Sequence, residues 1–147
     1  MKTKGFTLIE LLVAISIIAV LSTIGLIAYF GTIAKGRDNV RKEDLNKLSL
    51  ALEISAQRNG SYLCPAEEGC PITTCPADGD TTSTFYTKIA PDMSDKTVPT
   101  DPKDHSLYCY ISDGKTYTLC AKLENSTDRD INNPPSCKGY NYGVVPK

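Results

Sequence analysis

The chain lacks the residue patterns that most nucleic-acid-binding proteins and many enzymes carry. Lysine and arginine form no cluster in its 147 residues, and the formal net charge is −1, so the basic patch typical of nucleic-acid binding is absent. Histidine occurs once, at His105, and no serine or cysteine motif surrounds it. The sequence DGKT at 113–116 is not a phosphate loop, because the position that such a loop reserves for glycine holds Cys109. We therefore predict a protein without enzymatic activity and without a nucleic-acid site.

Cysteine is absent from the first 63 residues, and all six cysteines follow. This distribution favours disulfide bridges in an exported domain. The spacing of Cys70 and Cys75 would also suit a pair of zinc ligands, but export favours bridges. Three cysteines lie within 64–75 and three lie further along, so at least one bridge must join the two groups if all six pair internally. The candidate disulfide residues are Cys64, Cys70, Cys75, Cys109, Cys120 and Cys137.

Charge is nearly absent between Phe6 and Phe30, where Glu10 is the one charged residue. These 25 residues exceed the roughly 20 that a membrane-spanning helix needs. A secretory signal peptide would have a shorter apolar stretch followed by a small-residue cleavage site, and the sequence has neither. Lys2 and Lys4 precede the segment, and the positive-inside rule places them in the cytoplasm. We therefore predict a permanent single-pass anchor with the cysteine-rich domain outside the cytoplasm.

The sequence KGFTLIELLVAISIIAVL at 4–21 resembles the start of a type IV prepilin, in which a short basic leader ends in glycine. This family comprises type IV pilins and the pseudopilins of type II secretion. The resemblance implies that a prepilin peptidase cuts between Gly5 and Phe6 and methylates the new amine of Phe6. It also implies three further partners, namely the membrane, an inner-membrane assembly platform and other copies of the chain in a helical filament.

The resemblance supplies a physical reason for the glutamate at position 10, within an apolar run. A charged side chain inside a membrane span costs about 2.5–3.5 kcal/mol on insertion scales, so such residues are normally paired. The resemblance implies that Glu10 neutralises the cationic Phe6 amine of a neighbouring subunit and so sets the axial register of the filament. The alternative is a glutamate that reaches the membrane surface near the helix end and has no partner.

Proline is absent from the span, although many type IV pilins have one there. Small residues occur instead, among them Ser22, Thr23 and Gly25, and glycine weakens a helix by about 1 kcal/mol relative to alanine. Two readings stay open at this point: the helix melts locally near Ser22 to Gly25, or it is continuous and curved.

The same helix is predicted to continue beyond the membrane to about Arg58. Leu45, Leu48 and Leu52 recur three and four residues apart, which is typical of a helix that packs one face on a core. Gly60 provides a C-terminal stop. The remaining positions are filled by charged residues, which we predict to face away from the core: Arg37, Asp38, Arg41, Lys42, Glu43, Asp44, Lys47 and Glu53.

Residues 60–105 hold six of the nine prolines and predict a long, mostly irregular connection with a helical turn at Phe85 to Ile89. After them, LYCYI (107–111) and TYTLCAKL (116–123) flank an Asp-Gly hairpin signal, and GYNYGVV (139–145) suits a last strand. The predicted fold is α+β, with a long N-terminal helix on a small antiparallel sheet, which the pilin resemblance also implies. The predicted organisation is a leader (1–5), a membrane or filament-core helix (6–30), its amphipathic continuation (31–59), a Pro/Cys-rich connection (60–105), and the sheet with the C-terminal loop (106–147).

Two features of the C-terminal region follow from the resemblance. A bridge between Cys120 and Cys137 would match the disulfide that closes the C-terminal loop of type IV pilins. Asp128 and Asp130 alternate like the opening of a calcium loop, but the later glycine and glutamate of an EF-hand are missing. The stretch resembles the calcium loop of major pseudopilins, and the alternative is a solvated acidic turn.

These observations predict a structural subunit of a type IV pilus or of a type II secretion pseudopilus-like filament. We expect it in the cytoplasmic membrane, N-terminus inside, before assembly, and in an extracellular or periplasmic filament afterwards. This function requires no cofactor, and calcium is the candidate ion. The alternative function is a membrane-anchored extracytoplasmic binding module, or a minor tip pilin, that uses the prepilin export route.

Overall fold

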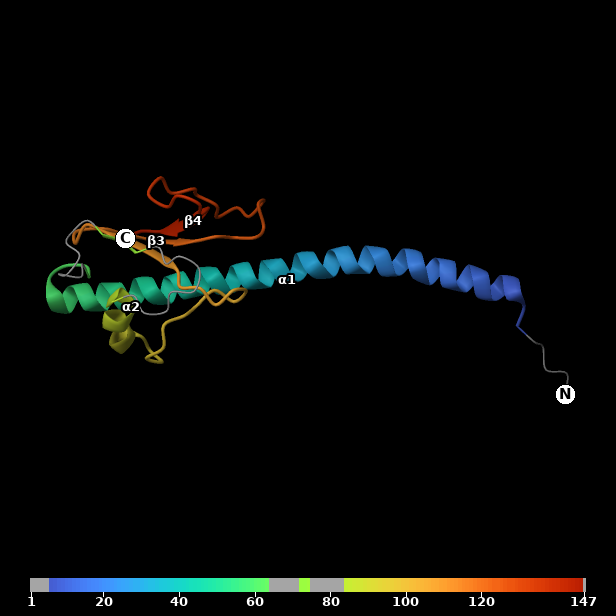
Figure 1. The fold of residues 1–147 in the computed structure, drawn as a ribbon, viewed down its shortest axis with the longest axis horizontal. Coiled ribbons are helices and arrows are strands. Elements are labelled where there is room, and N and C mark those ends of the chain that lie inside the picture. The colour runs from blue at the N-terminus through green and yellow to red at the C-terminus, as the bar shows by residue number, and fades with distance from the viewer. Residues whose placement is uncertain (1–5, 64–71, 75–83, 147) are drawn as a thin grey trace.

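The computed structural model of the chain describes residues 6–63, 72–74 and 84–146. One long helix dominates the molecule, and a small head packs along its C-terminal half while the N-terminal half extends beyond it (Figure 1). The fold is α+β and pilin-like, as predicted. Its elements are α1 (Leu8–Asn59), β1 (Ile72–Thr74), α2 (Thr84–Ile89), the 3-10 helix η1 (Ala90–Asp92), β2 (Cys109–Ser112), β3 (Tyr117–Ala121) and β4 (Tyr142–Val144).

The ends of α1 carry local stop and start signals. Thr7 is the N-cap, and its backbone is extended at φ −84° and ψ 150°. Gly60 ends the helix in the left-handed conformation at φ 76°, and its N–H donates to the carbonyl oxygen of Ala56 at 2.8 Å. Glycine adopts this conformation without the steric cost that a side chain adds. The predicted end near Arg58 is therefore correct to within one residue.

The helix is continuous through the glycine-containing part of the span. Residues Ser22 to Gly25 lie inside α1, and Figure 1 shows a gently curved rather than a broken helix there. The Thr23 hydroxyl donates to the carbonyl oxygen of Val20 at 2.7 Å, so this polar side chain is satisfied within the helix. At about 1.5 Å per residue, the 52 residues of α1 extend roughly 80 Å.

The four strands form an antiparallel sheet in the order β1-β2-β3-β4. β2 and β3 form the predicted hairpin, with Cys109 opposite Cys120 and Ser112 opposite Tyr117. In its turn, one carboxylate oxygen of Asp113 accepts the N–H groups of Lys115 and Thr116 at 2.9 and 2.6 Å. The Asp-Gly signal therefore identified a real turn.

Strand β1 forms within residues 60–105, which were predicted to be mostly irregular. Ile72, Thr73 and Thr74 pair with Ser112, Ile111 and Tyr110 of β2, so the sheet is not confined to the predicted 106–147 segment. Three residues are too few to show an alternating pattern. The strand forms because the edge of β2, nearly forty residues away in sequence, offers backbone hydrogen-bonding groups.

The core lies between the second half of α1, the sheet and α2. Leu45, Leu48 and Leu52 are fully buried, as their spacing predicted. Phe85 of α2 stacks on Tyr110 of β2 with ring centroids 3.8 Å apart. α2 therefore covers part of the core that α1 and the sheet leave open.

The prediction that the charged residues in the second half of α1 all face away from the core is wrong for three of them. Asp38, Arg41 and Asp44 have exposed fractions of 1%, 3% and 6%. They lie four or seven residues from Leu45 or Leu48 along the helix, so they share the buried face. Burial is tolerated because each has a partner, for example Tyr108, whose hydroxyl donates to Asp44 Oδ2 at 2.8 Å.

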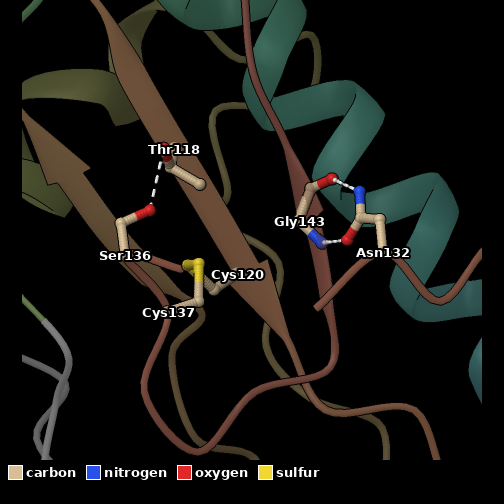
Figure 2. Close-up of a disulfide and its surroundings, with 6 residues drawn as sticks. All are labelled: Thr118, Cys120, Asn132, Ser136, Cys137 and Gly143. Carbon is tan, nitrogen blue, oxygen red and sulfur yellow. Dashed lines mark hydrogen bonds between the residues drawn. A yellow bond between two sulfur atoms is a disulfide. The ribbon is translucent and has the colours of Figure 1, made fainter. Parts of the chain in front are cut away.

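The C-terminal loop is fastened back to the sheet by a disulfide and by hydrogen bonds (Figure 2). A disulfide joins Cys137 of the loop to Cys120 of β3. The side-chain amide of Asn132 exchanges two hydrogen bonds with the backbone of Gly143, at 2.7 and 2.9 Å. Asn132 thus takes the place of a neighbouring strand beside β4, which protects a short stretch of exposed sheet edge.

Candidate assembly site

The first half of α1 presents its apolar side chains outward. Many of them are more than half exposed, and every described side chain from Phe6 to Thr32 is exposed. α1 is long and apolar enough to cross a membrane, by length and composition. A continuous apolar surface of this size marks a site that lipid or protein covers. Its exposed members include Leu8, Ile9, Leu11, Leu12, Ile15, Ile17, Ile18, Val20, Leu21, Ile24, Leu26 and Phe30.

Glu10 and Thr7 form a capping box at the start of this surface. Glu10 Oε2 accepts the backbone N–H of Thr7 at 2.9 Å and its hydroxyl at 2.8 Å. In return, the Thr7 hydroxyl oxygen accepts the backbone N–H of Glu10 at 3.3 Å. Two N–H groups that the first turn of a helix leaves unpaired are thereby satisfied.

The carboxylate of Glu10 is therefore not without a partner in the single chain. This contact was not predicted, although threonine followed three residues later by glutamate is a recognised capping signal. Glu10 now has two candidate roles: to cap its own helix, and to pair with a cation on another chain. Any test of the second role must leave the first intact.

The predicted processing site lies directly beside the capping box. Gly5 falls outside the described residues, whereas Phe6 is described and has an exposed fraction of 79%. Phe6 precedes the N-cap Thr7, so a cut before it would create a free amine next to the box that contains Glu10. The arrangement brings the two predicted assembly residues, Phe6 and Glu10, to the same end of α1.

At the other end of the apolar surface, an ion cluster attaches the head to α1. The Arg41 guanidinium donates from Nε and Nη2 to both carboxylate oxygens of Asp101, at 2.6 and 2.9 Å. Its Nη1 donates to Asp38 at 2.7 Å and to Glu124 at 2.8 Å. One buried cation on α1 thus holds carboxylates from two separate segments of the head.

Arg37 and Asp38, one turn before Arg41 on α1, strengthen the same attachment. Asp38 accepts the backbone N–H groups of Glu124 and Asn125 at 2.9 and 2.8 Å. Arg37 donates two hydrogen bonds to the Glu124 carboxylate, both at 2.7 Å. These bonds to Arg37, helped by Arg41, lower the pKa of Glu124 to about 2 even though partial burial opposes the shift. The cluster holds the head on the helix, and none of its groups is arranged as a nucleophile with a base.

The predicted disulfide residues divide between described and undescribed parts of the chain. Cys120 and Cys137 form the bridge of Figure 2, and Cys109 is disulfide-bonded as well. Cys64, Cys70 and Cys75 lie outside the described residues, as does the predicted bridge from their segment to the sheet. No cysteine of the described part of the chain is free.

The predicted calcium residues lie against a lysine. Asp128 and Asp130 each accept a hydrogen bond at 2.6 Å from the Nζ of Lys42 on α1. Among residues 6–63, 72–74 and 84–146, no group of three or more His, Cys, Asp or Glu side chains is placed to hold a metal ion. The helical pattern predicted Lys42 only as a charge that faces away from the core.

Comparison with known proteins identifies the N-terminal segment. Residues 1–26 match the family model described as the prokaryotic N-terminal methylation motif. This motif is the class III prepilin-type signal of type IV pilins and pseudopilins, so the chain carries the signal of a prepilin-type precursor. No curated protein and no solved structure matches the chain significantly. The motif points to a structural subunit rather than an enzyme, and with the apolar half of α1 it fits a membrane-anchored precursor.

Proposed function

We propose that this chain is a structural subunit of a filament of the type IV pilus or type II secretion pseudopilus kind. On this proposal, a prepilin peptidase cuts before Phe6 and methylates its amine, and an inner-membrane platform assembles the subunits through α1. One observation carries the proposal: an exposed apolar helix whose first turn contains Glu10 follows directly on a prepilin-type signal.

Apolar surface by itself does not select a filament over a membrane. Lipid tails cover the first half of α1 as well as neighbouring helices would, so transfer between the two gains little from the hydrophobic effect. The charged groups at the helix start supply the difference. In lipid, the new amine and Glu10 each lack a partner outside their own chain, whereas in a filament they neutralise each other.

This pairing also explains how a smooth apolar helix would find one axial position. A charge left unpaired in a low-dielectric environment is costly, and breaking a buried ion pair costs about 3–5 kcal/mol. A subunit that docks at the wrong height along its neighbours would leave both Glu10 and the Phe6 amine without an oppositely charged partner on another chain. The correct height therefore has a clear energetic advantage.

The capping box gives a competing explanation for Glu10. If its task is only to cap α1, then glutamine serves as well, because glutamine also completes a capping box. If its task is to neutralise an amine, glutamine fails because it has no charge. The variants Glu10→Gln, Glu10→Leu and Thr7→Ala separate these two roles.

We expect Glu10→Gln and Glu10→Leu to enter the membrane and lose their leader, yet to be missing from filaments. Thr7→Ala removes the hydroxyl of the capping box but keeps the carboxylate, and we expect it to assemble. The measurements are electron microscopy and immunoblotting of the sheared surface fraction, with intact mass to verify processing. A Glu10→Gln variant that assembles as well as the native chain would show that charge pairing is not needed.

The same experiment tests the alternative of a monomeric anchored binding module. Such a module keeps its function without subunit contacts, so the native chain itself would be absent from any filament and would fractionate with the membrane. In that case the Glu10 variants would be indistinguishable from the native chain in every fraction.

A further inference from the structure

We propose that Lys42 is a built-in cation that fastens the loop 124–133 to α1, at the point where the pseudopilin resemblance would place calcium. The head would then be held together without a divalent ion. The inference concerns the head alone and stands whether or not the chain forms filaments.

The geometry centres on one nitrogen atom. Lys42 Nζ lies 2.6 Å from Asp128 Oδ1 and 2.6 Å from Asp130 Oδ2. These are short distances for charge-assisted hydrogen bonds, which are stronger than neutral ones. The Tyr142 ring lies on the same cation, with its centroid 6.0 Å from Nζ. Two carboxylates and an aromatic face thus surround a single positive charge.

Burial makes this contact stronger than an ordinary surface ion pair. The side chains of Lys42 and Asp128 are only 17% and 16% exposed, whereas Asp130 is 61% exposed. The hydrogen bond from Lys42 lowers the pKa of Asp128, so this carboxylate stays charged. By comparison, the side chains of Lys47 and Glu43 on the same helix are 50% and 66% exposed, which is the setting in which ion pairs contribute little.

A calcium ion does not fit this arrangement. Calcium needs six to eight oxygen ligands at about 2.3–2.6 Å. An ion bound by Asp128 Oδ1 and Asp130 Oδ2 would have to take the position of the lysine nitrogen, which already lies 2.6 Å from each oxygen. The displaced ammonium would then be left beside a divalent cation and without its partners. Asp128 Oδ1 also accepts the backbone N–H of Asp130 at 3.0 Å, so the loop is already shaped around the lysine.

Lys42 completes a set of three attachments along the loop. Asp38, one helical turn before Lys42, holds the start of the loop through the N–H groups of residues 124 and 125. Lys42 holds its middle, and Asn132 holds its end on β4. Removal of Lys42 should therefore release the middle of the loop and leave both ends attached.

The test uses the oxidised full-length chain in detergent micelles. Arg129 lies between the two aspartates and is exposed, so tryptic cleavage after it reports opening of the loop. In Lys42→Met, which keeps an unbranched side chain one atom shorter and removes its charge, this cleavage should be about tenfold faster, because hydrogen bonds of a charged group are lost. The matched control Lys47→Met should cleave at the native rate.

A milder variant guards against a general failure to fold. Asp130→Asn weakens one of the two contacts at the exposed side of the loop, and we expect a smaller increase in cleavage of the same bond. Normal cleavage at Arg129 in both Lys42→Met and Asp130→Asn would overturn the proposal. Faster cleavage confined to this bond would support it.

Thermal melts with added calcium or a chelator complete the test. The native melting temperature should be the same in both, because the lysine already occupies the shared position. A native chain that melts higher with calcium and lower with chelator would overturn the proposal and restore the calcium interpretation of Asp128 and Asp130.

Discussion

The guanidinium of Arg41 and the carboxylate of Asp101 face each other in a two-point ion pair, with donor–acceptor distances of 2.6 and 2.9 Å. Their side chains are only 3% and 11% exposed, and 60 residues separate them in sequence. This pair connects α1 with the segment that leads into β2. It makes the second half of α1 a structural part of the head.

Loss of this pair should destabilise the head strongly. Arg41→Met leaves the carboxylates of Asp101 and Asp38 buried without their cation, which typically costs about 3–5 kcal/mol. Urea unfolding of the full chain in micelles, followed by the near-ultraviolet circular dichroism of its tyrosines, measures this change. The control is Arg129→Met, the same substitution at an exposed site, which should lie within about 0.5 kcal/mol of native. Equal stability of the two variants would contradict a stabilising role for Arg41.

Acid should weaken the same cluster. The pKa of Glu124 is lowered by Arg37 to about 2 in the folded chain, below the value of 4.5 that it has without these contacts. A lowered folded pKa means that the stabilisation is complete above pH 4.5 and is lost as the pH falls toward 2. Asp44 has the opposite effect on the pH dependence of stability, because burial raises its pKa.

The pH dependence is tested by comparing the native chain with Glu124→Gln. We expect the free energy of unfolding of the native chain to fall between pH 4.5 and 2, the interval set by the two values above. Glu124→Gln should be less stable at neutral pH and show a flatter profile over the same interval, since its side chain does not titrate. Parallel profiles would assign the acid sensitivity to other carboxylates.

Processing should remove the first five residues. Within a prepilin-type signal, we expect cleavage between Gly5 and Phe6 and a single methyl group on the new amine. Intact-mass measurement of the mature chain should show both changes together. A mature N-terminus at any other residue would contradict the prediction, and so would an unmodified Phe6.

The head should contain no free thiol. Alkylation under denaturing, non-reducing conditions is expected to label none of the six cysteines. Peptide mapping should recover Cys120 joined to Cys137, and a second bridge between Cys109 and the 64–75 segment. Replacement of both Cys120 and Cys137 by serine should cost about 3 kcal/mol, the loop-entropy estimate for a loop of this size. A labelled cysteine in the native chain would refute complete pairing.

Local sequence patterns predicted the regular elements well. The spacing of Leu45, Leu48 and Leu52 and the glycine at position 60 predicted the helix and its end, because both depend on residues a few positions apart. The Asp113-Gly114 turn predicted the hairpin for the same reason. β1 was not predicted, because it forms by pairing with β2, which lies far along the chain.

The sequence by itself identified the prepilin-type signal of residues 1–26 and the apolar, membrane-length run that contains Glu10. One carboxylate in an otherwise uncharged, membrane-length run, behind a leader that ends in glycine, is a local pattern and needs no folded structure to be recognised. The tertiary structure alone decided which charges of the second half of α1 are buried. Whether Arg41 and Lys42 face solvent or bind carboxylates depends on where Asp101, Asp128 and Asp130 are brought, and helical spacing carries no information about partners 60 to 88 residues away.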